Sequence, residues 1–341
     1  MGSFDLLHRQ SDRRATYATL QGLTWSDELS AWVSADPEAI RAALRAPEIE
    51  VIDFRSVYAT LSERFSIDFR PTVQVLDHVA LGLNGQPHHE VRRRQTLYLK
   101  SVTEAALAAY GDSLAAQLAA HADSGSFCLA RDLAFPAVDA MFGVLSGFRL
   151  DDRGGTSFSS IFDRRLGLNR RKAINEGIAR LIAGTEDPVA LEGVLTRISL
   201  SVVGADSLYG SLTQSLRQVL DSHPGRPLAR IDWPAEIPAT AVPYVDRIAR
   251  QTVTIAGTRI AAGERVRLYV EALKSGPDGP SAGLFGIGAH VCLGKHLSIK
   301  AWQMMVAALR SHPGTLTVTE HRFRPNDYLF NADDALIVAV S

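Results

Sequence analysis

One helical pattern dominates the middle of the chain. From Pro188 onward, apolar residues recur every three or four positions for about 30 residues, the spacing that keeps side chains on one helix face. The pattern consists of Leu191, Val194, Leu195, Ile198, Val202, Leu208, Leu212, Leu216 and Val219. Because helices in globular proteins average about 10–14 residues, we expect this one to be a central element on which several others pack.

The centre of this long pattern is locally weak as a helix. It reads Gly204-Ala205-Asp206-Ser207. Glycine costs about 1 kcal/mol relative to alanine inside a helix, and aspartate and serine compete for backbone hydrogen bonds. Two explanations stay open: a kink at which the aspartate is hydrogen-bonded, or a functional site.

Shorter helical patterns indicate an α-rich protein over residues 30–224 and 294–311. The stretch Ser101-Val102-Thr103-Glu104 has the form of a capping box, so we expect a helix to begin there and to end near Gly125. A nearly wholly apolar helix is expected over residues 132–148, and such a helix is typical of a buried position.

Beyond residue 250 the pattern changes to the alternation that is typical of strands. We expect a small β-meander over residues 250–271, a Gly/Pro/Ser loop over 274–283 and a terminal β-hairpin within 315–340. The sequence contains no internal repeat and no clear linker. The predicted fold class is therefore mainly α with a small β part, organised as a single domain over residues 1–341.

The charge balance excludes several classes of partner. Lysine and arginine number 36 against 37 aspartates and glutamates, which leaves a net charge of −1. Such a chain has no overall positive field to attract nucleic acid or an anionic membrane. The sequence starts with the polar stretch MGSFDLLHRQSDRR, which is unlike a signal peptide. We expect a cytoplasmic protein that binds neither nucleic acid nor membrane.

The most specific motif surrounds one of only two cysteines, Cys128 and Cys292. Residues 285–294 read FGIGAHVCLG, and a helix is expected directly after them. Two glycines let the backbone turn tightly and approach a flat ligand. A cysteine before a helix start lies near the positive end of the helix dipole, which stabilises a thiolate and suits metal ligation. The alternative is a small buried hydrophobic residue.

The pattern FGxGxHxCxG resembles the heme-binding loop of the cytochrome P450 superfamily. This resemblance implies a P450-like fold and a b-type heme whose iron is bound by the thiolate of Cys292. It also implies that Phe285 packs beside the sulfur, that Gly286 belongs to the cofactor loop, and that His290 reaches a heme propionate. An axial thiolate gives electron density to the iron and favours O–O cleavage.

Three further segments are similar to family elements, and the resemblance covers most of residues 30–341. Residues 86–94, QPHHEVRRR, resemble the helix whose histidine and arginine meet a propionate, which implies His89 and Arg93. Residues 246–257 resemble the strand that carries another propionate-binding arginine, here Arg247. Residues 127–148 resemble a family helix as well, which implies that Cys128 is a core residue.

The weak centre of the long helix also resembles a family motif. In Val203-Gly204-Ala205-Asp206-Ser207, the small residues would make room for O₂, while Asp206 and Ser207 would handle protons. Serine stands where threonine is common. It retains the hydroxyl but lacks the methyl group that restricts its rotamer.

Two family features are missing. The usual Glu-x-x-Arg is absent, since its only candidate is Glu236-Ile237-Pro238-Ala239, and only residues 274–283 stand where the family has a meander. Removing one partner of a buried ion pair costs several kcal/mol, whereas removing both leaves no isolated charge. The segment 150–188 is short as well, which implies a reduced lid. The chain is therefore expected to be a shortened family member.

Three functions remain for such a chain. The first is a heme-thiolate monooxygenase that oxidises a small or carrier-presented metabolite in specialised biosynthesis. The second is a heme-thiolate enzyme without reductase-driven O₂ activation: peroxide-dependent, isomerising, dehydrating or bond-forming. The third is a non-catalytic, P450-like protein that recruits a partner.

An electron donor would need a docking surface. Arg92, Arg94, Lys295 and Lys300 provide four cations that an acidic ferredoxin could meet. An ordinary solvated helix face is the alternative explanation.

Overall fold

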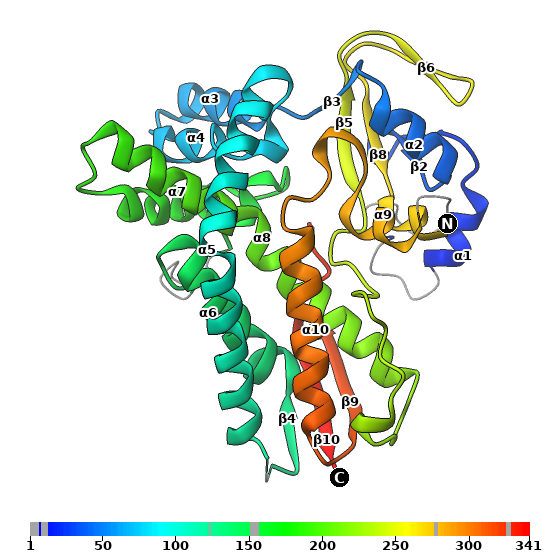
Figure 1. Cartoon of the computed structure of the whole chain (residues 1–341). Coiled ribbons are helices and arrows are strands. Elements are labelled where there is room, and N and C mark those ends of the chain that lie inside the picture. Colours follow the sequence, from blue (N-terminus) through cyan, green and yellow to red (C-terminus); the bar gives the residue numbers. More distant parts are fainter. Residues whose placement is uncertain (1–6, 8–12, 123, 151–156, 276–278, 325–328) are drawn as a thin grey trace. The chain divides into compact units, whose positions relative to one another are not determined.

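The computed structural model (Figure 1) describes the chain except residues 1–6, 8–12, 123, 151–156, 276–278 and 325–328. The chain divides into two compact units that are built from interleaved segments. Unit 1 comprises residues 1–53, 80–88 and 242–292, and unit 2 comprises residues 54–79, 89–241 and 293–341. The single domain expected over residues 1–341 stays a prediction.

Unit 1 is built on a five-stranded sheet with the strand order β1-β2-β8-β5-β3. The strands are β1 Thr24–Ser26, β2 Ala31–Ser34, β8 Arg265–Leu268, β5 Val245–Ala249 and β3 Ile49–Val51. Strands β2 and β8 pair in parallel, and the other neighbours pair antiparallel.

The residues expected to form a meander, 250–271, are arranged differently. Strands β6 (Val253–Ile255) and β7 (Thr258–Ile260) form a separate hairpin, and β8 pairs with β2 and β5 instead of β7. The first strands β2 and β3 lie within the segment that was expected to be α-rich. Each has only three or four residues, which is too few for a period to show. Strands β8 and β5, with which they pair inside the sheet, lie about 200 residues further along.

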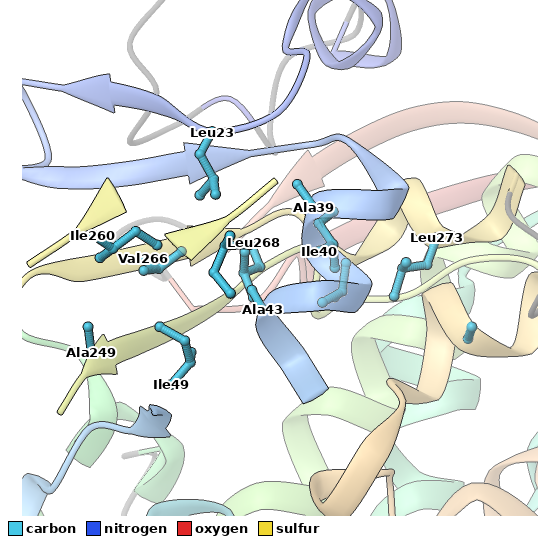
Figure 2. Packing of buried hydrophobic residues seen from close by; sticks show 13 residues of the cluster. Leu23, Ala39, Ile40, Ala43, Ile49, Ala249, Ile260, Val266, Leu268 and Leu273 are labelled. Atoms are coloured by element: carbon cyan, nitrogen blue, oxygen red, sulfur yellow. The ribbon is translucent and has the colours of Figure 1, made fainter. Parts of the chain in front are cut away.

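The core of unit 1 lies between this sheet and helix α2, Pro37–Arg45 (Figure 2). Asp36 caps α2 by accepting hydrogen bonds from the N–H groups of Glu38 at 2.8 Å and Ala39 at 3.3 Å. One face of α2 is fully buried against the strands, at Ala39, Ile40 and Ala43. A large aliphatic side chain such as Ile40 contributes about 1.5–3 kcal/mol when it is buried, and the alanines contribute less. Other short helices of the unit are α1 Arg13–Thr19, a 3₁₀ turn Val270–Ser275 and α9 Pro280–Phe285.

Unit 2 contains most of the helical residues. Its helices are α3 Phe54–Phe65, α4 Arg70–Leu76, α5 Gly85–Ala120 (which starts in unit 1), α6 Phe135–Ser146, α7 Leu168–Ile182, α8 Pro188–Asp221 and α10 Lys295–Ser311. Its sheet has the order β4-β10-β9, formed by Ser126–Cys128, Asp333–Val340 and Leu316–Phe323. The fold class expected from the sequence, mainly α with a small β part, is confirmed.

The long helix expected from Pro188 is confirmed as α8, 34 residues long. Asp187 caps it by accepting a hydrogen bond from Ala190 N–H at 2.7 Å, and Pro188 occupies the first turn. Helices α4, α6 and α7 and strands β9 and β10 all contact it. Within the described part of the chain, α8 is the one helix whose length and apolar composition would suit a membrane span, a test that the core helix of a soluble protein also passes.

Helix α5 corrects the expected helix start at Ser101. It runs through this position without a break, because the Ser101 hydroxyl donates to Tyr98 O and the Thr103 hydroxyl to Leu99 O, both at 2.7 Å. These side chains bond to the preceding turn and leave the helix intact. The capping-box pattern was therefore a false signal.

The other sequence-based elements are confirmed with shifted ends. The helix expected over 132–148 is a π-helical turn, Leu129–Ala134, followed by α6. Cys128 is buried, as a core residue should be. The helix expected at 294–311 is α10, and the two terminal strands are β9 and β10. The loop expected over 274–283 contains the start of α9, and its residues 276–278 lie outside the described part.

Candidate functional site

The cysteine motif forms a closed loop in unit 1. Helix α9 ends at Phe285, and Gly286 follows with φ 70° and ψ −177°, a conformation that is open in practice only to glycine. A single 3₁₀ turn, Gly288–His290, comes next. The N–H of Cys292 then donates to Phe285 O at 2.7 Å and closes the loop. Phe285 is buried, whereas Cys292, at the end of the loop, is exposed.

The second glycine of the loop is required for two reasons. Gly288 has φ 76°, which L side chains rarely adopt. A Cβ at this position would also lie 3.2 Å from Leu44 O at the end of α2. The sequence therefore specifies glycine here for both its conformation and its close approach to a neighbouring backbone.

Two histidines meet beside this loop. The rings of His290 and His88 have centroids 4.3 Å apart, and His88 is buried. The sequence pointed instead to His89 and Arg93, which are both exposed on α5. Sequence reasoning missed His88, although the doublet at positions 88 and 89 offered it. The roles of His89 and Arg93 toward a propionate stay predictions.

Arg247 is a buried cation on strand β5. Burial lowers its pKa to about 10, despite the nearby charge of Asp246. Its Nη1 donates to the backbone carbonyl of Asp246 at 2.9 Å, while the Asp246 carboxylate accepts from Arg267 at 2.8 Å and from Arg265 at 3.4 Å. Among the described residues, no carboxylate forms an ion pair with Arg247. A buried guanidinium in this state is well suited to an anionic ligand.

Asp206 is a buried carboxylate on α8 in unit 2. Its Oδ1 accepts from Arg324 Nη1 at 2.8 Å, and its Oδ2 accepts from the hydroxyl of Ser159 at 3.0 Å and from that of Ser157. The Ser207 hydroxyl donates to Val203 O at 2.8 Å, within its own helix. Both residues to which the resemblance assigned proton handling are thus hydrogen-bonded inside unit 2, and that assignment stays a prediction.

Comparison with known proteins rests on the structure, since neither a family model nor a curated protein matches the sequence. The structure of CalO2 matches with a TM-score of 0.79, covering 99% of this chain and 98% of that chain at 17% identity. P450BioI, in complex with a hexadec-9Z-enoic acid ligated acyl carrier protein, matches with 0.76 over 100% of both chains at 17% identity. The cytochrome P450 enzyme CYP109B1 from Bacillus subtilis matches with 0.68 over 95% of this chain and 97% of that chain at 13% identity. This chain has a cytochrome P450 fold.

The P450 fold is preserved here without the usual Glu-x-x-Arg helix. Glu236 is exposed in an irregular segment between α8 and β5. Tryptophans fix this segment instead: Trp233 Nε1 donates to Leu228 O at 3.0 Å, and Trp302 of α10 donates to Pro234 O at 2.9 Å. Their rings lie 6.0 Å apart. Apolar packing and two backbone acceptors hold this segment, in a chain from which the Glu-x-x-Arg pair was expected to be missing.

The small residue at the centre of α8 has a packing reason within this fold. A Cβ on Gly204 would lie 2.9 Å from the Phe142 ring on α6. Glycine therefore allows the two helices to pack closely. This contact accounts for Gly204 without reference to O₂, and the predicted role of the small residues remains a separate expectation.

One cation of the expected docking surface is already paired. Arg94 of α5 forms an ion pair with Glu192 of α8. Lys295 and Lys300 are exposed on α10, and Arg92 is half-buried. Gly111 of α5 lies against Met304 of α10. A Cβ on this glycine would lie 2.7 Å from the methionine Cε, so the contact requires a glycine or a shifted methionine.

Proposed function

We propose that this chain is a heme-thiolate oxidoreductase of the monooxygenase type, in the cytoplasm, acting on a small metabolite in specialised biosynthesis. The observation that carries the proposal is the exposed Cys292, on a loop closed by its own N–H and shaped by Gly286, within a P450 fold. This loop leaves a soft, exposed ligand on a rigid support, as an axial ligand requires.

The residues of the chain fit a b-type heme. Cys292 would bind the iron, and Phe285, buried before the loop, would pack beside the sulfur. Arg247 would bind a propionate, because it is a buried cation that no described carboxylate pairs. His290, His89 and Arg93 would supply further donors to the propionates. When bound, a thiolate-ligated heme supplies an electron-rich iron that favours O–O cleavage.

The substrate is proposed to be a small molecule, either free or presented on a carrier protein. P450BioI, which has a similar fold, binds an acylated carrier protein, and this supports the carrier-presented form. The proposed electron donor is an acidic ferredoxin that meets Arg92, Lys295 and Lys300. Reduction would then slow with added salt, because exposed charges are screened beyond about 8–10 Å at moderate ionic strength.

The second candidate is a heme-thiolate enzyme that uses peroxide or no oxidant. The specific observation in its favour is that Asp206 and Ser207 both form internal hydrogen bonds, so neither is poised to relay protons. The pairing of Arg94 with Glu192 further reduces the expected ferredoxin surface. Turnover with ferredoxin and its reductase would favour monooxygenase activity, and turnover with peroxide alone would favour the second candidate.

The deciding experiment is an optical spectrum of the protein purified with heme, reduced and treated with CO. We expect a strongly red-shifted Soret band, which reports a thiolate ligand. Cys292→Ala should lose this band, while the matched control Cys128→Ala should retain it, because Cys128 is buried among core residues. A native spectrum in the Cys292 variant would refute the proposed ligand.

A further inference from the structure

Asp206 joins three segments of unit 2 that are far apart in the sequence. Ser157 and Ser159 precede and begin the 3₁₀ turn Phe158–Phe162, Asp206 lies in the middle of α8, and Arg324 directly follows β9. Both oxygens of the carboxylate accept side-chain hydrogen bonds, one from the guanidinium and one from the two hydroxyls. These are the contacts of an ionised group held in place from both sides.

Arg324 is also fixed by contacts other than Asp206. Its guanidinium lies over the Tyr209 ring, 4.6 Å from the centroid. Its backbone N–H donates to Ala332 O at 2.9 Å. The Tyr209 hydroxyl, one turn along α8 from Asp206, donates to Asp333 O at 2.7 Å. Arg324, Asn331, Ala332 and Asp333 therefore form a neck, where the chain leaves β9 and returns into β10, and α8 contacts this neck at several points.

A second buried carboxylate secures the other side of the neck. Asp333 is fully buried, and its oxygens accept from Gln214 Nε2 at 2.9 and 3.0 Å. His321 Nε2 lies 2.5 Å from the same carboxylate. The N–H of Asn331 donates to Ala241 O at 2.9 Å. Among the described contacts, α8 thus holds the neck through the ion pair between Asp206 and Arg324 and through the Gln214 amide and the Tyr209 hydroxyl.

We propose that Asp206 is the anchor of Arg324, and that Arg324 is a positioning residue that sets the neck of the β9–β10 hairpin against α8. In this proposal the Asp206 carboxylate binds the Arg324 guanidinium and does not relay protons. This inference stands on unit 2 alone. It does not depend on the proposed function.

The first test is a double-mutant cycle of thermal unfolding on the purified protein, with Asp206→Asn, Arg324→Gln and the double variant. Each single change should lower the unfolding midpoint by about 5 °C, because each removes one charge of an ion pair whose carboxylate is buried. The unfolding midpoint of the double variant should be no lower than that of the less stable single variant. Additive losses would overturn the anchor, since independent sites add.

The matched control is Arg322→Gln, two residues earlier on β9, where the arginine pairs with Asp334 and Glu320 at the exposed surface. Its midpoint should stay within about 1 °C of the parent, because exposed pairs contribute little. Arg324→Lys should recover part of the loss, as it restores the charge but not the fork of donors. Equal losses from Arg322→Gln and Arg324→Gln would overturn the proposal.

The second test measures local opening of the neck by amide hydrogen exchange, which separates a local displacement from a general loss of stability. Amide hydrogen exchange at Arg324 and Asn331 should accelerate in both Asp206→Asn and Arg324→Gln, while exchange at the far ends of β9 and β10 stays slow. Changes confined to the Asp206 variant would overturn the shared positioning role.

These arms separate the two proposals. Loss of the heme spectrum in the parent protein would refute the proposed function, whereas the thermal cycle and the hydrogen exchange would still decide the anchor. Conversely, a red-shifted CO spectrum with an additive thermal cycle would preserve the function and refute the anchor.

Discussion

The two units each bury a charge, and the two charges differ in how they are compensated. In unit 1, Arg247 is buried on β5 with a backbone carbonyl as its partner, and burial lowers its pKa to about 10. In unit 2, Asp206 is buried on α8 and accepts from one guanidinium and two hydroxyls. Removing one partner of a buried ion pair destabilises the fold strongly, whereas a buried cation without a counter-ion favours an anionic ligand. The comparison suggests a cofactor role for Arg247 and a structural role for Asp206.

The largest expected effect tests the compensated charge. Asp206→Ala removes the acceptor of Arg324 and leaves a partly buried cation, so we expect the free energy of unfolding to fall by about 3–5 kcal/mol. Urea unfolding followed by circular dichroism measures it. A loss below about 1 kcal/mol would show that Arg324 finds water or another acceptor, and the contrast between the two charges would disappear.

The second-largest effect tests steric packing on α8 instead of charge. Gly210 of α8 faces Ala241 and the hairpin neck: a Cβ there would lie 2.7 Å from the Ala241 Cβ and 3.0 Å from Asn331 O. Gly210→Ala should therefore destabilise the protein by about 1–3 kcal/mol through overpacking. Gly193→Ala is the control, since its Cβ would meet nothing closer than 3.7 Å. Equal unfolding curves for both variants would contradict a close approach at Gly210.

The third prediction concerns Arg247, the buried charge without a counter-ion. Replacing it should change the free energy of unfolding little and the rate of heme loss more. Arg247→Met replaces a buried cation by an apolar side chain of similar length, so unfolding of the heme-free protein should change by less than about 1 kcal/mol. Heme should be lost roughly 10-fold faster, because a charge-assisted hydrogen bond contributes about 1.5–3 kcal/mol. Transfer of heme to apomyoglobin measures the rate.

The control for this prediction is Arg250→Met, just after β5, where the arginine pairs with Glu50 at the surface. Heme loss from this variant should match that from the parent. If both arginine variants lose heme at the same rate, Arg247 has no special relation to a propionate.

The smallest effect concerns a half-buried charge, that of Asp36, whose hydrogen-bond donors are backbone N–H groups. Burial alone would raise the pKa of Asp36, but the N–H groups of Gly22, Ala39 and Glu38 donate to its carboxylate and hold the pKa below its ordinary value. Because the folded protein lowers this pKa, the contribution of Asp36 is complete above the ordinary value of about 4 and is lost as the pH falls through the lowered value.

Asp36→Ala should cost about 1 kcal/mol at neutral pH, and less as the acid transition proceeds. Asp36→Asn keeps a good capping side chain without a charge, so it should retain most of the stability and lose this pH dependence. Unfolding in urea at several pH values measures both. An unchanged pH profile in the asparagine variant would show that the carboxylate charge does not contribute.

Local patterns were enough to predict several elements and one chemical motif. The apolar repeat from Pro188 became α8, and the alternation near the C-terminus became β9 and β10. The glycines of the cysteine loop took the positive φ angles that such a turn requires. These predictions succeeded because each depends on residues only a few positions apart.

Predictions that depended on distant contacts were incomplete or wrong. A helix start was expected at Ser101, but α5 continues through it. The N-terminal strands were not foreseen, since β2 and β3 are defined by their partners β8 and β5. His88 was passed over for its neighbour, because the sequence does not show which of two adjacent histidines is buried against His290.

The sequence by itself determined the long helix, the glycine-shaped cysteine loop and the residue types available for heme chemistry, since these follow from local conformation and composition. Only the tertiary structure decided how the buried charges are compensated. Asp206 and Arg324 are separated by 118 positions, and Arg247 lies one residue from a carboxylate that two other arginines bind. Whether a buried charge is paired depends on which distant side chains fold against it, and that is the physical reason why the sequence alone left the role of Asp206 open.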